Sequence, residues 1–235
     1  MHNLSKLDNP VWHSLDEAHR RFAVGDEELK FYLPNIAPFG GINSKDRQVL
    51  RKLDDCIQTN EPFFIIGNLP EMPPENYAVH FELICAQMIQ TEPIEVGMTE
   101  EIVYLNDDYG DPLAELVNQV QPGYFRKDTR LMGDYFGIFK EGKLVAVTGE
   151  RMRMDDFVEI SAVVTHPDFT GRGYAKQLVA YTVNKNLAAG TTTYLHVAAS
   201  NTPAIALYEK LGFRHLPTIS VWKMNRIDNF KPIFS

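Results

Sequence analysis

Residues 163–175 decide the fold of this 235-residue chain: Val163-Val164-Thr165-His166-Pro167-Asp168-Phe169-Thr170-Gly171-Arg172-Gly173-Tyr174-Ala175. The stretch combines an apolar strand, a turn, a Gly-x-Gly loop and the start of a helix. Glycines let the backbone approach a ligand closely, and the N–H groups at a helix N-terminus attract anions such as phosphates. The stretch is neither a P-loop nor a dinucleotide-binding fingerprint, because the spacing of both is absent. The alternative interpretation is that these glycines only form a tight turn between strand and helix and bind no ligand.

Apolar periodicity predicts alternating strands and helices around this stretch. The expected strands are 102–105, 135–139, 144–153, 157–165, 194–198, 213–216 and 220–224. The expected helices are 112–120, about 172–189 and 203–211. Gly190 and Gly212 follow the last two helices, at a position where glycine is favourable.

The first 98 residues show weaker patterns. A helix is expected after Pro10, a second helix between Ser44 and Ile57 with Ser44 as its cap, and a buried strand at 63–66. Residues 77–91 alternate like a strand at first but fit a helix as well, so both interpretations stay open. A weak boundary at 92–99 divides the chain into a helix-rich α/β region, 1–98, and a second domain, 99–235.

Composition and charge exclude several functional classes. No apolar run approaches the roughly 18–20 residues that span a bilayer, and the N-terminus lacks a signal-peptide pattern, so no membrane attachment is expected. Cys56 and Cys85 belong to no CxxC or nearby histidine pair, which predicts a reducing cytoplasm, no disulfide framework and no metal. The net charge is −8, with 8 Lys/Arg against 15 Asp/Glu in residues 1–98. An acidic chain without a basic stripe is a poor nucleic-acid binder.

A second motif follows the first by about 30 residues and comprises 194–197 and 201–213. Together the two motifs resemble those of the GNAT acetyltransferase superfamily, and the order of elements from Ile102 to Met224 matches that fold. The resemblance implies a mixed α/β sheet with the acyl-CoA N-acyltransferase fold for 99–235. The N-terminal α/β extension is then either a degenerate second copy of the fold or a cap over the acceptor site.

Three further stretches sharpen the resemblance. The sequence around Gly133-Asp134-Tyr135, 146–150 and 159–167 is similar to that of bacterial members grouped with the glycine-N-acyltransferase-like subset. That likeness implies an enzyme that uses acetyl-CoA as cosubstrate and no metal.

The resemblance also assigns residues to the cosubstrate. Backbone amides of the loop Thr170, Gly171, Arg172, Gly173, Tyr174 and Ala175 hold the pyrophosphate. Thr170 stands where the family usually has Gln or Arg, although Arg172 can supply positive charge. Val163, Val164 and Thr165 pair with the pantetheine arm, and an N–H near Val163 or Val164 stabilises the oxyanion. Asn201 hydrogen-bonds the arm, unless it only caps its helix.

Two further residues are candidates for proton transfer. Tyr208 matches the tyrosine that protonates the departing thiolate, and its alternative role is a core aromatic. Glu159 falls where histone-modifying members carry their general base, with Glu150 as the second choice. Either glutamate can instead face solvent or pair with Arg151 or Arg153. We expect His196 to be a structural residue whose ring nitrogens are hydrogen-bonded within the fold, rather than an active-site group. Tyr124 and Phe125 are candidates for the acceptor pocket.

The resulting expectation is an N-acetyltransferase in which a primary amine attacks the thioester directly in a ternary complex. The alternative is a non-catalytic domain that binds or senses acyl-CoA. The acceptor is expected to be a small-molecule or peptide amine, with no nucleic-acid or membrane partner. Trp222 lies on a C-terminal strand that can pair between subunits, which leaves a homodimer open.

Overall fold

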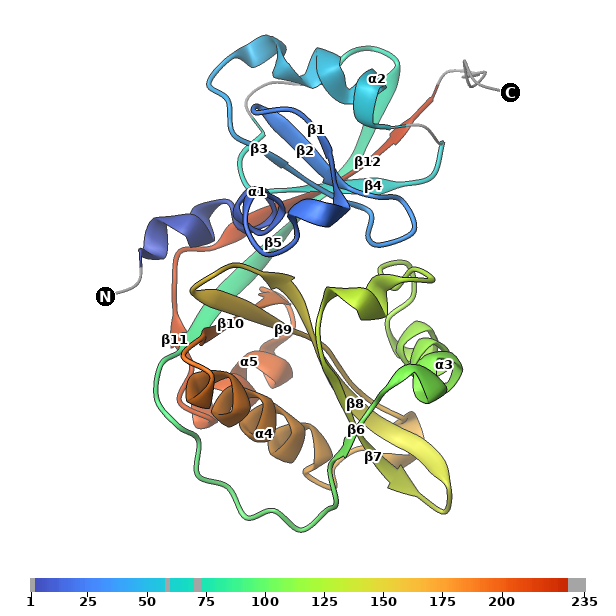
Figure 1. Cartoon of the computed structure of the whole chain (residues 1–235), viewed down its shortest axis with the longest axis vertical. Helices are drawn as coiled ribbons and strands as arrows, with labels where there is room; N and C mark the ends of the chain where they lie inside the picture. The colour runs from blue at the N-terminus through green and yellow to red at the C-terminus, as the bar shows by residue number, and fades with distance from the viewer. Residues whose placement is uncertain (1–2, 58–59, 70–72, 228–235) are drawn as a thin grey trace. The chain divides into compact units, whose positions relative to one another are not determined.

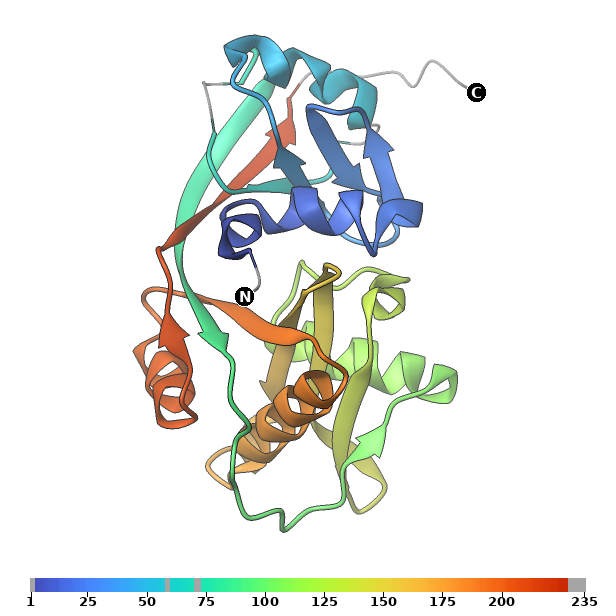
Figure 2. The ribbon, with the colours of Figure 1, turned by 60° about the vertical axis from the view of Figure 1, so that its left-hand side comes forward.

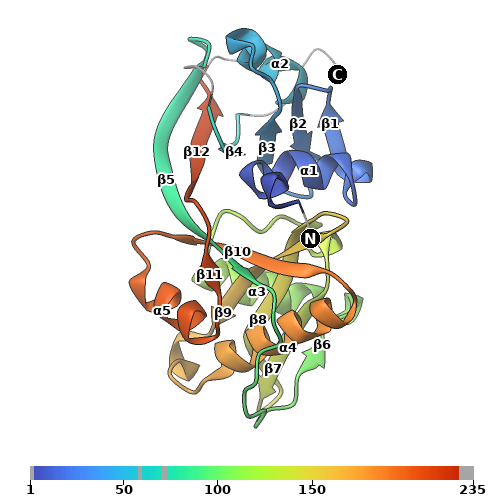
Figure 3. The ribbon, with the colours of Figure 1, turned by 90° about the vertical axis from the view of Figure 1, so that its left-hand side faces the viewer.

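A computed structural model describes residues 3–57, 60–69 and 73–227. The chain divides into two compact units, a first unit of residues 1–34, 38–85 and 218–235, and a second unit of residues 35–37 and 86–217. Strand β5 (Tyr77–Gln90) belongs to both, because the division falls between Cys85 and Ala86 (Figure 3). The compact units therefore differ from the expected division at residues 98 and 99.

The first unit is a sheet in the order β1-β2-β3-β4-β12-β5. Its strands are β1 (Ala23–Gly25), β2 (Leu29–Tyr32), β3 (Phe39–Ile42), β4 (Phe63–Ile66) and β12 (Ile219–Arg226), with the first part of β5. Neighbours pair antiparallel, except that β3 and β4 are parallel. The remaining elements are η1 (Leu4–Asp8), α1 (Pro10–Asp16), η2 (Arg20–Phe22), η3 (Arg47–Lys52) and α2 (Leu53–Cys56).

The second unit is a sheet in the order β5-β10-β9-β8-β7-β6, with β11 also paired to β5. Its strands are β6 (Val103–Tyr104), β7 (Tyr135–Lys140), β8 (Lys143–Arg153), β9 (Phe157–Thr165), β10 (Thr192–Ala198) and β11 (Arg214–His215). Its helices are η4 (Asp107–Tyr109), α3 (Gly110–Val120), η5 (Thr129–Met132), η6 (Pro167–Phe169), α4 (Tyr174–Ala188) and α5 (Thr202–Lys210). Strands β9 and β10 are parallel, whereas β6, β7, β8 and β9 pair antiparallel in succession.

Helices cover both faces of the second sheet (Figures 1 and 2). Leu178 and Val179 of α4 and Tyr208 of α5 pack into apolar clusters on one face, whereas Leu113 and Leu116 of α3 belong to a cluster on the other. The glycine loop lies between β9 and α4, so the sheet and its helices place the predicted site residues on neighbouring elements.

The mixed α/β architecture confirms the predicted fold class, and the strands at 63–66 and 157–165 have the predicted bounds. The ambiguous stretch 77–91 is strand β5. The sequence patterns did not indicate β1, β2 and β3, because these strands are short and show little alternation. In β3 the backbone approaches its neighbours closely, since a Cβ at Gly40 would lie 2.4 Å from the Phe31 ring.

The helix predicted between Ser44 and Ile57 differs from the expectation in its type and in its cap. It is the short pair η3 and α2, and Asp46 is its cap because the Asp46 side chain accepts from the N–H of Gln48. The Ser44 hydroxyl instead accepts from the N–H of Asp46, two residues before the N-terminal contact of Asp46 with Gln48.

Candidate active site

The glycine loop leaves an exposed stretch of backbone before α4. Gly171 and Gly173 have φ of 75° and 77°, in the left-handed region that glycine enters readily. Gly173 is the N-cap of α4 and offers no side chain to the first N–H groups of the helix. A Cβ added at either glycine would meet nothing within 4 Å. Open backbone at an uncapped helix N-terminus fits a phosphate group.

Side chains of the same loop support the turn and supply charge. The Thr170 hydroxyl donates to the Pro167 carbonyl at 3.1 Å, and His166 Nδ1 accepts from the N–H of Asp168 at 3.3 Å. The Arg172 guanidinium lies 4.8 Å from the centre of the Phe169 ring. Thr170 and His166 therefore shape the turn, while Arg172 places a cation beside it.

Strands β9 and β10 separate next to this loop. Their parallel pairing ends at Ile160 and Leu195, although β9 continues to Thr165 and β10 to Ala198. Backbone groups of residues 163–165 on the β10 side are thus not used in pairing with β10. An extended ligand can hydrogen-bond to them as an added strand does.

A bulge in β9 accompanies the separation. Val147 pairs with Val164 but Gly149 pairs with Ser161, and Ala162 has φ of 50°. A non-glycine residue in this region costs about 1–3 kcal/mol, and such strain is found mostly at functional sites. Sequence reasoning missed this bulge, because Ala162 carries no side-chain signal for a left-handed conformation.

Tyr208 packs beside the separating strands. It is 7% exposed and shares an apolar cluster with Ile160 and Leu195, against which Val163 also packs. Burial raises its pKa to about 12, so the hydroxyl stays protonated at neutral pH. Within the described part of the chain this hydroxyl makes no hydrogen bond, which leaves its proton available to a ligand.

Asn201 caps α5, the helix that carries Tyr208. Its Oδ1 accepts from the N–H of Ala204 at 3.2 Å, as the structural alternative predicted. Its Nδ2 makes no hydrogen bond to any described residue, so the amide has donors left for a ligand. Capping and ligand contact are therefore compatible at this residue.

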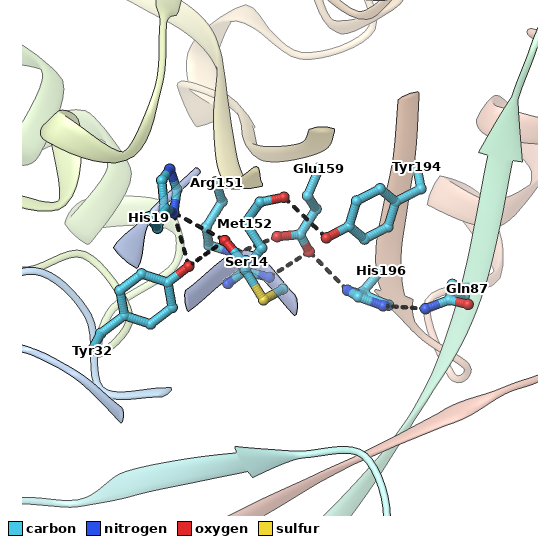
Figure 4. A network of polar contacts seen from close by, with 9 residues as sticks. All are labelled: Ser14, His19, Tyr32, Gln87, Arg151, Met152, Glu159, Tyr194 and His196. Carbon is cyan, nitrogen blue, oxygen red and sulfur yellow. Dashed lines mark hydrogen bonds and ion pairs between the residues drawn. The ribbon is translucent and has the colours of Figure 1, made fainter. Parts of the chain in front are cut away.

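Glu159, the predicted general base, is 0% exposed and paired on both oxygens. Arg151 holds it in a two-pronged contact, with Nε to Oε2 and Nη2 to Oε1 both at 2.7 Å (Figure 4). Burial opposes the charged form, but the Arg151 charge and the hydrogen bonds of Arg151 and His196 outweigh it and hold the pKa at about 2. The pairing with Arg151, which the sequence left open, is the arrangement found, and it makes Glu159 a weak proton acceptor.

His196 links Glu159 to a residue that sequence reasoning did not single out. Its Nδ1 lies 2.8 Å from Glu159 Oε1, and its Nε2 lies 2.8 Å from Nε2 of Gln87 on β5 (Figure 4). His196 is satisfied on both nitrogens, as expected. Gln87 lies 109 residues before His196, and no local pattern connects the two.

Glu150, the second choice for the base, is also buried among partners. Its Oε1 accepts from Lys185 Nζ at 2.9 Å, and its Oε2 accepts from Arg153 Nη1 at 3.1 Å and from the N–H of Asp134 at 3.2 Å. Lys185 also contacts the Asp134 carboxylate. Glu150 therefore stabilises the junction of β7, β8 and α4.

The structure places the predicted residues on consecutive elements. Residues 163–165 lie at the end of β9, the loop 170–175 leads from β9 into α4, Asn201 is the N-cap of α5, Tyr208 lies on α5, and Glu159 lies on β9 within its pairing with β10. Phe125, a candidate for the acceptor pocket, packs edge-on against Tyr135 at 5.8 Å. A cavity of about 570 Å³ formed by residues 90–95, 210–212 and 214 holds none of the predicted site residues.

Three other features bear on the site. Among residues 3–57, 60–69 and 73–227, no three His, Cys, Asp or Glu side chains are grouped to hold a metal ion. No helix in these ranges is long and apolar enough to cross a membrane. Cys56 and Cys85 are buried and form no disulfide in the described structure.

Comparison with known proteins places this geometry in a family. The sequence pattern of FR47-like proteins matches residues 135–223. A solved structure described as a GNAT-family acetyltransferase, from Novosphingobium aromaticivorans DSM 12444, is 30% identical with a TM-score of 0.86, covering 94% of this chain and 98% of that one. A tandem GNAT protein from the clavulanic acid biosynthesis pathway shares the fold, at 15% identity and a TM-score of 0.54 over 86% of this chain and 79% of that one.

A sequence relative gives the same answer. YjgM of Escherichia coli K12, described as an uncharacterized N-acetyltransferase, is 30% identical over 134 residues, which are 56% of this chain and 75% of that protein. The chain spans between 28% and 75% of the length of the curated relatives that it matches. With the glycine loop and the separated strands, this similarity shows that the chain belongs to the GNAT acetyltransferase superfamily.

Proposed function

We propose that the second unit is an N-acetyltransferase that moves an acetyl group from acetyl-CoA to a primary amine by direct attack in a ternary complex. The observation that carries the proposal is the separation of β9 and β10 beyond Ile160 and Leu195, directly beside an uncapped helix N-terminus. The separated strands can bind the extended pantetheine arm, and the helix N-terminus can bind the phosphates at the end of that arm.

The residues present fit coenzyme A. Gly171 and Gly173 leave room for the pyrophosphate, and Arg172 contributes positive charge beside it. Residues 163–165 offer backbone groups to the pantetheine arm, and the Nδ2 group of Asn201 offers a further donor.

The reaction then needs few groups from the protein. Acetyl-CoA supplies a thioester: the amine nitrogen bonds to its carbonyl carbon and gives up one proton to water, the carbon–sulfur bond breaks, and the electron pair leaves with sulfur as a thiolate. An N–H at Val163 or Val164 donates to the oxyanion, an interaction worth about 3–4 kcal/mol in other enzymes. The Tyr208 hydroxyl gives its proton to the thiolate and is reprotonated from water.

A covalent route through cysteine has no support. Cys56 is buried in the first unit, and burial raises its pKa to about 11, so it stays a thiol. Positioning of the amine against the carbonyl therefore supplies a large part of the rate enhancement.

The second candidate is a domain that binds or senses acyl-CoA without turnover. Thr170 in place of Gln or Arg and the fully paired Glu159 favour it. For the catalytic candidate, the acceptor that we propose is a small-molecule or peptide amine.

Two measurements separate the candidates. Calorimetric titration with acetyl-CoA should show micromolar binding, equivalent to about −8 kcal/mol. Thiol release should then be screened against a panel of amino acids, peptides and polyamines. Binding with release supports the transferase, binding without release for any amine supports the sensor, and no binding contradicts both.

A further inference from the structure

Tyr135 carries a buried hydroxyl that the fold leaves without a partner. The residue is 3% exposed, and its oxygen makes no hydrogen bond to any described residue. Burial raises the pKa of the phenol above its usual value, and the opposing charge of Arg151 does not cancel this effect, so the group stays a neutral hydroxyl. Buried polar groups are almost always hydrogen-bonded, and one that is not calls for a ligand or a water molecule.

The Tyr135 ring lies across its neighbour in β8. Tyr135 pairs with Gly149, and a Cβ added at Gly149 would lie 2.1 Å from ring atom Cε1 and 2.8 Å from Cζ, the atom that bears the hydroxyl. A glycine leaves the space that the ring fills, and Phe125 contacts the ring edge-on at 5.8 Å. The hydroxyl therefore points from β7 over β8 toward β9.

A second hydroxyl without a partner lies in the same row of the sheet. Ser161 of β9 pairs with Gly149, so its side chain lies on the face that the Tyr135 ring covers. The Ser161 hydroxyl makes no hydrogen bond to any described residue either. Ser161 is partly exposed, as are Ala162 and Phe125, so a ligand can reach this row from solvent.

The row lies next to the site proposed for the thioester. Pairing between β9 and β10 ends at Ile160, so Ser161 is the first residue of β9 beyond it. Helices α4 and α5 pack on the opposite face, where Tyr208 and Ile160 share a cluster. Tyr135 belongs to the cluster of α3 on this face, against which Ala162 packs. An amine on this face therefore approaches the thioester from the side that the cosubstrate leaves free.

We infer that the hydroxyls of Tyr135 and Ser161 bind the nitrogen of the acceptor and select a primary amine. This inference rests on the proposed function. A neutral primary amine has two N–H bonds and one lone pair. When both N–H groups donate to the two hydroxyl oxygens, the lone pair is directed away from them and toward the carbonyl carbon of the thioester.

The same arrangement disfavours a secondary amine. A neutral secondary amine has a single N–H bond, so it loses one of the two contacts. With a primary amine, one of the two protons leaves to water after the attack, and the other stays on the amide nitrogen. Selection therefore depends on the hydroxyls as well as on the space around the nitrogen.

The charges beside the row fit a neutral nitrogen. Glu159 lies two residues before Ser161 on β9. Its two oxygens accept from Arg151 at 2.7 Å, and one of them also lies 2.8 Å from His196. Because this carboxylate is already paired, the two hydroxyls hold the acceptor by hydrogen bonds and not by charge.

Kinetics on two probes test the inference: the primary amine of the panel that releases thiol fastest, and its N-methyl derivative. Tyr135→Phe and Ser161→Ala each remove one acceptor, so kcat/KM for the primary amine should fall about 5- to 10-fold in each and about 50-fold in the double variant. The N-methyl derivative should lose less, so the preference for the primary amine should shrink.

Tyr194→Phe is the matched control. The Tyr194 hydroxyl is buried in the same sheet but donates to the Met152 carbonyl at 3.0 Å. Its removal should lower the melting temperature and leave the preference between the two amines unchanged. Tyr135→Phe and Ser161→Ala should keep the melting temperature, because neither hydroxyl has a partner in the described fold.

Binding separates the ways in which the inference can fail. Calorimetry with acetyl-CoA should give the wild-type affinity in Tyr135→Phe and Ser161→Ala, and a lost affinity would show that these residues act on the cosubstrate instead. Unchanged kcat/KM in both variants, or an equal loss for both amines, would overturn the inference and leave the two hydroxyls to water. A wild type that binds acetyl-CoA but releases thiol with no amine defeats the proposed function itself, and the inference with it.

Discussion

The two units repeat one arrangement of elements but differ where a ligand would bind. Each has a helix, three antiparallel strands, a helical crossover and a fourth strand parallel to the third: β1-β2-β3-β4 in the first unit and β7-β8-β9-β10 in the second. The crossover of the second unit is the 15-residue helix α4, whereas the first unit has only a six-residue η3 and a four-residue α2.

The caps of the two crossovers explain the difference. In the first unit the Asp46 carboxylate accepts from the N–H of Gln48 at 2.9 Å and thereby occupies the helix end. In the second unit Gly173 stands at the N-cap and contributes no side chain. A scaffold can therefore gain an anion site by losing a cap, and the same scaffold with an acidic cap repels a phosphate.

Buried polar groups also separate the units. The first unit has a triangle of hydrogen bonds in which the Ser14 Oγ, the Tyr32 hydroxyl and His19 Nδ1 lie 2.7 to 3.1 Å apart (Figure 4). The second unit has an ion pair, Arg151 with Glu159, at a similar depth of burial. The buried cluster of the second unit therefore depends on a carboxylate that acid can protonate, whereas that of the first unit consists of two hydroxyls and an imidazole.

The largest effect is expected from Gly173→Glu, which adds a carboxylate at the proposed pyrophosphate site. Affinity for acetyl-CoA should fall more than about 100-fold, because the glutamate carboxylate repels the pyrophosphate and its side chain fills the space that the glycine leaves open. Gly142→Glu is the control, because Gly142 has φ of 76° with the same open space but lies in the β7–β8 turn. Both variants should lose about 1–2 kcal/mol of stability, and calorimetry should find lost binding only in the first. Equal affinities would contradict the loop assignment.

Acid should destabilise the protein through Glu159 by a few kcal/mol. The folded pKa of about 2 lies below the usual carboxyl range, so the stabilisation is complete above about pH 5 and is lost as the pH falls toward 2. Urea unfolding of wild type and Glu159→Gln between pH 3 and 7 should show a steeper decline for the wild type.

Asp26 of the first unit serves as the comparison for that experiment. The Lys52 hydrogen bond also lowers its pKa to about 2, but the pair is exposed. The contribution of Asp26 should therefore shrink with added salt, while that of Glu159 stays. Equal salt sensitivity of the two would refute the buried ion pair.

Tyr208→Phe should lower kcat about 10- to 100-fold with little change in acetyl-CoA affinity. Stability should hardly change, since the hydroxyl makes no hydrogen bond among the described residues. In the first unit Tyr77 donates to Asp54 at 2.7 Å, so Tyr77→Phe should lower stability by about 1 kcal/mol and leave kcat unchanged. An unchanged kcat in Tyr208→Phe would make Tyr208 a core residue only.

The smallest effect compares the two side-chain caps. Asn201→Ala and Asp46→Ala should each cost about 1 kcal/mol of stability. Only Asn201→Ala should also weaken acetyl-CoA binding, by about 3- to 10-fold, because its amide donors are lost as well. Thermal unfolding and calorimetry on both proteins decide the point, and identical affinities would reduce Asn201 to a cap.

Local patterns predicted the second unit well and the first unit less well. The apolar run before the glycines gave the bounds of β9, and the short strands β1 to β3 were missed because glycine and few alternating residues define them. The bulge at Ala162 and the contact of Gln87 with His196 depend on register between distant strands, which no local pattern encodes. The roles of Tyr208, Asn201 and the loop remain predictions.

The strand β5 and its neighbours carry a consequence for how such a chain can evolve. The first sheet needs β12 from the end of the chain, and β10 of the second needs β5 from the first half. A break at residue 98 would give one fragment without β12 and another without β5, so neither would contain all its strands. Fragment complementation, with both pieces produced together, should be required for either to fold. Once fused in this way, the two halves can diverge in sequence but must be inherited as one gene.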